Sequence, residues 1–126
     1  MHEATLVENI LKIALAAARD FQSAHPDLPE PRIKTITCES GLLSCVEEHT
    51  LKACLEIFAE GTPAAGASLK LRTAPLACKC ADCGHEFSLC QCHFICPDCS
   101  GDNIRFSGGR GFTIQSIDVD CGENEE

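Results

Sequence analysis

The chain has 126 residues, enough for one modest hydrophobic core together with a smaller metal-stapled module, but too few for two full cores. Its formal net charge is −9, from 10 basic and 19 acidic residues, which argues against a nucleic-acid partner because such proteins use Lys and Arg to neutralise phosphates. It has eleven cysteines but no tryptophan or tyrosine, so the thiols are expected to have a chemical role.

The amino end predicts neither a secretory signal nor a membrane span. Glu3, Glu8 and Lys12 interrupt its apolar stretch, and no basic segment precedes it. We therefore expect a cytoplasmic protein. In a reducing compartment, an odd number of cysteines indicates metal ligation with some spare thiols rather than a disulfide framework.

The first elements along the chain are a helix and a strand. Apolar residues recur every three or four positions between residues 6 and 21, which is typical of an amphipathic helix. Three prolines within residues 26–31 end this helix. Residues 32–37 are rich in β-branched side chains and predict a strand, followed by a turn at Ser40 and Gly41.

A second helix is predicted after residue 47. Ser44 and Glu47 have the spacing of a capping box, in which the Ser44 side chain accepts from the Glu47 amide and the Glu47 side chain reaches back. Glycine and proline at positions 61 and 63 mark the end of this helix. Residues 68–73 alternate in polarity and predict a strand, and residues 112–119 predict a last one.

This order of elements predicts an α+β fold. A three-stranded sheet with two helices would occupy residues 1–75 and 109–121. A small zinc-ribbon-like module would be inserted at residues 76–108, and residues 122–126 would form a solvated acidic tail.

The inserted segment contains two C-x-x-C turns separated by twelve residues. Each turn places two thiolates side by side, and a small residue directly after its second cysteine permits the tight backbone. Two facing turns make a tetrahedral four-sulfur shell, which favours zinc, and four thiolates leave no open position for a catalytic water. The predicted zinc ligands are Cys80, Cys83, Cys96 and Cys99.

The same segment contains additional donors that leave the ligand set open. These five residues lie close enough in sequence to replace one of the four cysteines, or to remain spare thiols and secondary ligands: Cys78, His85, Cys90, Cys92 and His93. The two C-x-x-C pairs are preferred because their turn geometry suits tetrahedral coordination better.

The chain begins Met1-His2-Glu3, which offers a short nitrogen chelate. The α-amine of Met1, a backbone amide and the imidazole of His2 form a donor set that suits Ni(II) or Cu(II). A histidine near a terminus is more often only a solvated side chain, so this motif alone does not decide the matter.

Several segments in the same order over nearly the whole chain resemble the HypA/HybF family of hydrogenase maturation nickel metallochaperones. They are the initial Met-His-Glu, residues 41–46, residues 61–67, the two cysteine turns and residues 117–120. The resemblance implies transport of Ni(II) to the large subunit of a [NiFe] hydrogenase together with a hydrogenase maturation GTPase, and no enzymatic activity. It implies nickel ligation by Met1 and His2, with Glu3 contributing and a structural Zn(II) elsewhere. Glu47 stands where some relatives have an acidic residue near the metal, although its capping role already explains it.

Two other functions remain as alternatives. A zinc-ribbon adaptor for protein interactions would bind one metal per chain and would not depend on the amino-terminal residues. A thiol redox sensor would form reversible disulfides from the surplus cysteines and release zinc on oxidation.

Overall fold

The computed structural model of the chain describes residues 3–121. Met1, His2 and the predicted acidic tail of residues 122–126 lie outside the described residues. The elements in chain order are α1 (Glu3–Ala24), β1 (Arg32–Gly41), a 3-10 turn (Leu42–Ser44), α2 (Glu48–Phe58), β2 (Ser68–Ala74), β3 (Leu76–Cys80), β4 (Glu86–Leu89), β5 (Ile104–Phe106) and β6 (Phe112–Asp120). Within the described range no helix is long and apolar enough to cross a membrane.

The chain divides into two compact units. The first, called here the helix-and-sheet unit, contains the residues up to Cys38, residues 46–71 and the residues from Ile114 onward. The second, called the cysteine unit, contains residues 39–45 and 72–113.

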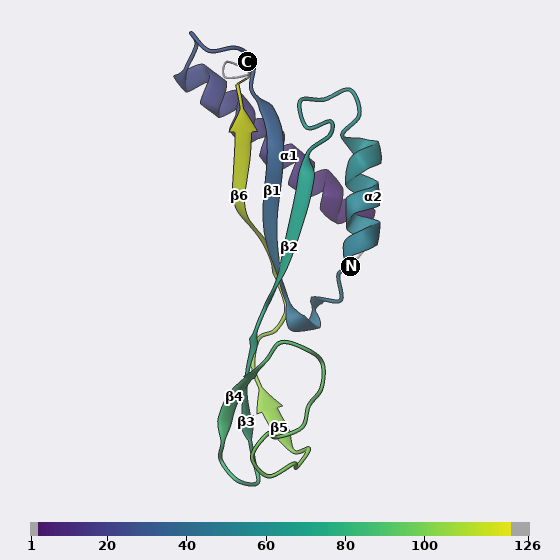
Figure 1. Cartoon of the computed structure of the whole chain (residues 1–126), viewed down its shortest axis with the longest axis vertical. Helices are drawn as coiled ribbons and strands as arrows, with labels where there is room; N and C mark the ends of the chain where they lie inside the picture. Colours follow the sequence, from purple (N-terminus) through teal and green to yellow (C-terminus); the bar gives the residue numbers. More distant parts are fainter. Residues whose placement is uncertain (1–2, 122–126) are drawn as a thin grey trace. The chain divides into compact units, whose positions relative to one another are not determined.

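The helix-and-sheet unit has the predicted arrangement of two helices with a three-stranded sheet, in the order β2-β1-β6. The helices α1 and α2 pack against each other, and α1 crosses one face of the sheet (Figure 1). The core side chains Val7, Ile10, Ile36 and Leu51 are at most 1% exposed. Three- and four-residue spacing of apolar side chains in α1 therefore produces a buried stripe, as the sequence predicts.

The cysteine unit contains a second three-stranded sheet, in the order β4-β3-β5. Both neighbours pair with β3 in antiparallel fashion, and Cys78 lies opposite Phe87 on one side and Phe106 on the other. The strand β3 ends at Cys80, so the sheet carries the first predicted zinc ligand directly to the turn that follows.

The predicted turn lies slightly later than expected, and the predicted cap of α2 is wrong. The strand β1 continues to Gly41, whose amide donates to the carbonyl of Gly111, and the 3-10 turn Leu42–Ser44 follows directly. The Ser44 hydroxyl does not cap α2, because it donates to the Gly111 carbonyl and accepts from the Gly111 amide, each at 2.8 Å. The N-cap of α2 is Glu47 itself.

Candidate metal centre

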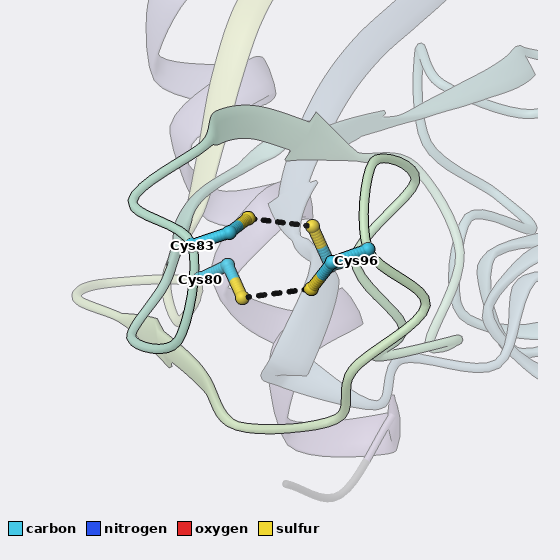
Figure 2. A group of neighbouring side chains, drawn as sticks. Cys80, Cys83 and Cys96 are labelled. Carbon is cyan, nitrogen blue, oxygen red and sulfur yellow. Dashed lines mark hydrogen bonds between the residues drawn. The ribbon is translucent and has the colours of Figure 1, made fainter.

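The four predicted zinc ligands lie together at the two turns of the cysteine unit. The sulfurs of Cys80, Cys83, Cys96 and Cys99 are all within 4.8 Å of one another. The sulfurs of Cys83 and Cys96 are 3.6 Å apart (Figure 2). The sulfur of Cys80 lies 3.6 Å from that of Cys99. A zinc–sulfur bond of about 2.3 Å in a tetrahedron separates the sulfurs by about 3.8 Å, so this donor set has the size and chemistry that fit one zinc ion.

Each pair of sulfurs is positioned by a tight backbone turn. The Gly84 amide donates to the Cys80 carbonyl at 2.8 Å, and the Ser100 amide donates to the Cys96 carbonyl at 2.9 Å. Gly84 and Ser100 both have positive φ values, +81° and +64°. The small residues after the second cysteine of each pair therefore adopt the left-handed conformation that the turn requires.

Backbone amides favour negative charge on one sulfur of the group. Burial opposes ionisation of Cys96, but the amides of Cys99 and Asp98, together with hydrogen bonds from the Cys83 and Cys99 thiols, outweigh it and lower its pKa to about 7. The Asp98 amide lies 3.4 Å from the Cys96 sulfur. At Cys83 the His85 amide favours the thiolate, yet desolvation and the neighbouring sulfurs raise the pKa to about 12. Once one thiol of the group is ionised, a second is therefore harder to deprotonate unless a cation neutralises the negative charge.

The surplus donors do not join this group. Within residues 3–121, the four cysteines are the only cluster of three or more His, Cys, Asp or Glu donor atoms within 4.8 Å of one another. Cys78 is buried, its thiol donates to the Leu76 carbonyl at 3.5 Å, and burial raises its pKa. His85 stacks on Phe87 with 5.7 Å between ring centroids. Cys90 and Cys92 are exposed on the loop between the two turns.

A second polar constellation lies in the helix-and-sheet unit, where α1 begins beside α2. Glu3 is the first residue of α1, and its carboxylate accepts from the Glu47 amide at 3.0 Å. This bond is the largest cause of the lowered pKa of Glu3. Met1 and His2, the other predicted nickel ligands, lie outside the described residues.

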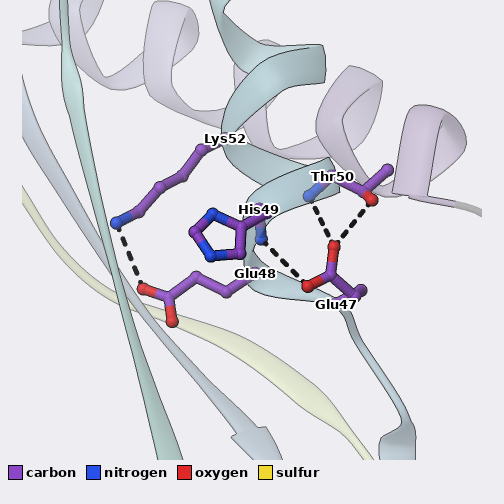
Figure 3. A network of polar contacts seen from close by, with 5 residues as sticks. All are labelled: Glu47, Glu48, His49, Thr50 and Lys52. Atoms are coloured by element: carbon purple, nitrogen blue, oxygen red, sulfur yellow. Dashed lines mark hydrogen bonds and ion pairs between the residues drawn. The ribbon is translucent and has the colours of Figure 1, made fainter.

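The Glu47 carboxylate is engaged at the start of α2 (Figure 3). It accepts from the Thr50 hydroxyl at 2.7 Å, from the Thr50 amide at 2.8 Å and from the His49 amide at 3.4 Å. The Thr50 contacts are the main reason that the pKa of Glu47 is lowered. Sequence reasoning missed both Thr50 as a donor and the bond between Glu3 and Glu47. A threonine three positions after Glu47 is a local pattern from which the cap could have been predicted. No pattern in the sequence indicates the hydrogen bond between Glu3 and Glu47, which are 44 positions apart.

Comparison with known proteins decides the family. The profile of the family described as "Hydrogenase/urease nickel incorporation, metallochaperone, hypA" matches residues 1–119. The chain belongs to this HypA family. It is therefore a member of a nickel metallochaperone family rather than of a family of catalytic enzymes, and the resemblance inferred from the sequence is confirmed.

Individual relatives agree with this assignment. The chain is 33% identical over 120 residues to the hydrogenase maturation factor HypA of Dehalococcoides mccartyi, with 95% of each chain covered. It is 30% identical to the hydrogenase maturation factor HybF of Salmonella typhimurium, covering 95% of this chain and all of that one. The solution structure of the Ni metallochaperone HypA from Helicobacter pylori matches with a TM-score of 0.57 at 19% identity, covering 94% and 97% of the two chains, which shows a shared fold.

Proposed function

We propose that this chain binds Ni(II) at its amino end and delivers it to the large subunit of a [NiFe] hydrogenase, together with a hydrogenase maturation GTPase. The ligands are the α-amine of Met1 and the imidazole of His2, and Glu3 contributes to the site. Family membership supports nickel as the cargo, and nitrogen donors of this kind suit Ni(II).

The observation that carries this proposal is the hydrogen bond between Glu3 and the Glu47 amide. It fastens the first residue of α1, next to His2 in sequence, to the start of α2 within one compact unit. A ligand-bearing segment attached to a fixed point loses less conformational entropy when it closes on an ion. The bond thus restricts the chain beside the two nitrogen donors.

Glu47 has a supporting role in this proposal rather than a ligating one. Its carboxylate already accepts three hydrogen bonds from His49 and Thr50. Coordination of nickel by this carboxylate would leave the start of α2 uncapped, which is unfavourable. We therefore expect Glu47 to act through its backbone amide, which holds Glu3.

Release of the cargo follows from the chemistry of the donors. An amine and an imidazole bind a metal only when deprotonated, so protonation favours dissociation. A site formed largely by terminal nitrogens is also open to a competing ligand set on a recipient protein. Both properties suit a carrier that must collect its ion and later give it up.

The four-cysteine group holds a structural zinc ion in this proposal. Cys80, Cys83, Cys96 and Cys99 would all coordinate as thiolates, and the ion would supply the positive charge that lets neighbouring thiols ionise together. Four protein ligands close the shell, so the ion organises the cysteine unit and carries out no chemistry of its own.

Nickel titration by calorimetry tests the amino-terminal site, with the native Met1 amine and with zinc already bound. His2→Ala, and separately an extra glycine fused before Met1, are each expected to weaken nickel binding by at least about 10-fold, because each removes or displaces a donor. His25→Ala is the matched control. That histidine also belongs to the helix-and-sheet unit, but its ring is engaged with the Phe21 carbonyl at the other end of α1. Unchanged nickel affinity in both test variants would disprove the terminal site.

A further inference from the structure

The loop between β4 and the second cysteine turn contains four residues that the proposed function does not use. They are Cys90, Gln91, Cys92 and His93, called here the CQCH loop. The loop has no helical or strand structure, and all four residues are exposed. It therefore presents two thiols and an imidazole within four consecutive positions.

The exposure of these thiols is unusual. Free cysteines are among the most buried residues in proteins, where they act as small apolar side chains. In this part of the chain Cys78 follows that rule, whereas Cys90 and Cys92 do not. Among residues 3–121, the side chains of Cys90, Cys92 and His93 have no hydrogen-bond partner or ion pair. Neither packing nor capping explains why these donors are here.

The CQCH loop borders a hollow of about 540 Å³ in the cysteine unit. Its walls include Cys90, His93, Ile95, Cys96 and Pro97. One thiol and one imidazole of the loop therefore line the same open hollow as Cys96, a ligand of the four-cysteine group.

Two tight turns lie in the loop and in the residues directly after it. The His93 amide donates to the Gln91 carbonyl at 2.8 Å, and the Ile95 amide donates to the His93 carbonyl at 3.0 Å. Each bond spans only two residues, so the backbone reverses sharply at Cys92. Cys90 and His93 stand on either side of Cys92 in the sequence, so all three donors lie within four consecutive positions at this turn.

We infer that the CQCH loop is a second zinc site, separate from both the four-cysteine group and the amino-terminal nickel site. Cys90 and Cys92 bind Zn(II) as thiolates, and His93 binds it through a neutral imidazole. Two sulfurs and one nitrogen are ligands that Zn(II) prefers, and two thiolates neutralise its charge. The fourth position is left to water or an exchangeable ligand, so this ion is exchangeable rather than structural.

The second site is expected to be weaker than the first. Within residues 3–121, only the four-cysteine group has its donor atoms within 4.8 Å of one another, and the donors of the CQCH loop are not part of it. The ion must order the loop as it binds, and that ordering reduces the affinity. An affinity at least about 100-fold lower than that of the four-cysteine group is expected.

Zinc titration against a competing chelator tests the stoichiometry. His2→Ala is present in every sample, so that the amino-terminal nitrogens contribute no site. This chain is expected to bind two zinc ions, and the double variant Cys90→Ser with Cys92→Ser is expected to bind one, with unchanged affinity for the first. Cys45→Ser, which removes an exposed thiol outside the loop, should keep both. A single ion in the unaltered loop, or two ions in the double variant, would overturn the inference.

Thiol alkylation followed by peptide mass mapping gives a readout that needs no loop variant. One equivalent of zinc should protect Cys80, Cys83, Cys96 and Cys99 while Cys90 and Cys92 still react. A second equivalent should slow alkylation of Cys90 and Cys92 by at least about 10-fold, since a coordinated thiolate is a poorer nucleophile. Equal alkylation rates at one and two equivalents would exclude the site. Nickel titration of the double variant separates the two proposals, because the amino-terminal site should be unaffected.

Discussion

The two units of this chain are held together by different means. In the helix-and-sheet unit, bulky aliphatic side chains such as Ile10, Ile36 and Leu51 are at most 1% exposed. In the cysteine unit, by contrast, the buried hydrophobic residues within the described range are Leu76 and the cysteines at positions 78, 80 and 96. One unit has an apolar core, and the other has mainly sulfur in its place.

This difference predicts unequal dependence on metal. Burial of one Leu or Ile side chain contributes about 1.5–3 kcal/mol, so several such residues can offset the entropy cost of a small unit. The cysteine unit has little apolar area to bury, and units of that size usually need a metal or disulfides. We therefore expect the cysteine unit to require zinc and the helix-and-sheet unit to fold without it.

The largest effect is expected for Cys80→Ser. Cys80 is fully buried at the end of β3, and its sulfur lies 3.6 Å from that of Cys99. Loss of this ligand should weaken zinc binding by more than about 100-fold, because changing a residue that only hydrogen-bonds to a metal ligand already costs about 10–100-fold. Hydrogen exchange should show β3, β4 and β5 losing protection while α1 and α2 retain it.

A control for this comparison is Cys54→Ser, a half-buried thiol in α2. It should keep its zinc and its protection in both units. Full zinc retention in Cys80→Ser would mean that another thiol completes the shell. Simultaneous loss of protection in α1 would contradict the separate stabilisation of the two units.

A change in the aliphatic core should give the opposite pattern. Leu51→Ala removes a side chain that is fully buried in α2, and it should destabilise the helix-and-sheet unit by about 2–5 kcal/mol. Ile57→Ala, in the same helix but 66% exposed, should change stability by less than about 0.5 kcal/mol. Thermal unfolding followed by circular dichroism measures both, and zinc content should remain the same. Zinc loss in Leu51→Ala would link the two units.

The smallest effect concerns pH and the cap of α2. The pKa of Glu47 is lowered in the folded chain, chiefly by its hydrogen bonds with Thr50. Its contribution to stability is therefore complete above the unfolded value of 4.5, and it disappears as the pH falls through the lower folded value. At pH 7, Glu47→Gln should lower the Tm by a few degrees, and this difference should shrink as the pH falls below 4.5.

Glu56→Gln, at another exposed carboxylate of α2, provides the control for that titration. Its Tm should follow that of the unaltered chain at every pH. A difference between Glu47→Gln and the unaltered chain that does not shrink at all as the pH falls below 4.5 would show that the ionised carboxylate is not responsible.

The features predicted correctly from the sequence depend on local spacing. The apolar periodicity between residues 6 and 21 gave α1, which extends from Glu3 to Ala24. Alternating and β-branched segments gave the strands that form the β2-β1-β6 sheet. Two C-x-x-C pairs predicted the four sulfurs that lie together, because each turn needs only a cysteine pair and a small residue after it.

The features that were missed depend on residues far apart in sequence. The capping box failed because the Ser44 hydroxyl bonds with the backbone of Gly111, and local propensity cannot reveal that competitor. The hydrogen bond from the Glu47 amide to Glu3 likewise exists only after α1 and α2 have packed together. A helix cap can be predicted from the local sequence only if no residue far away in sequence forms hydrogen bonds with the capping side chain or with the amides at the start of the helix.

The meeting of Gly41 and Gly109 in the cysteine unit limits how this sequence can diverge. A methyl group on Gly41 would overlap the carbonyl of Gly109, which also accepts from the Leu43 amide at 2.6 Å. A methyl group on Gly109, whose φ is +89°, would come within 2.8 Å of the tip of Leu76. At position 109 a second substitution could shorten the leucine side chain, although the positive φ would still strain any other residue there, whereas the obstacle at position 41 is backbone. No second substitution can therefore relieve the clash at position 41, so we expect sequences that descend from this chain to retain that glycine while the residues around it change.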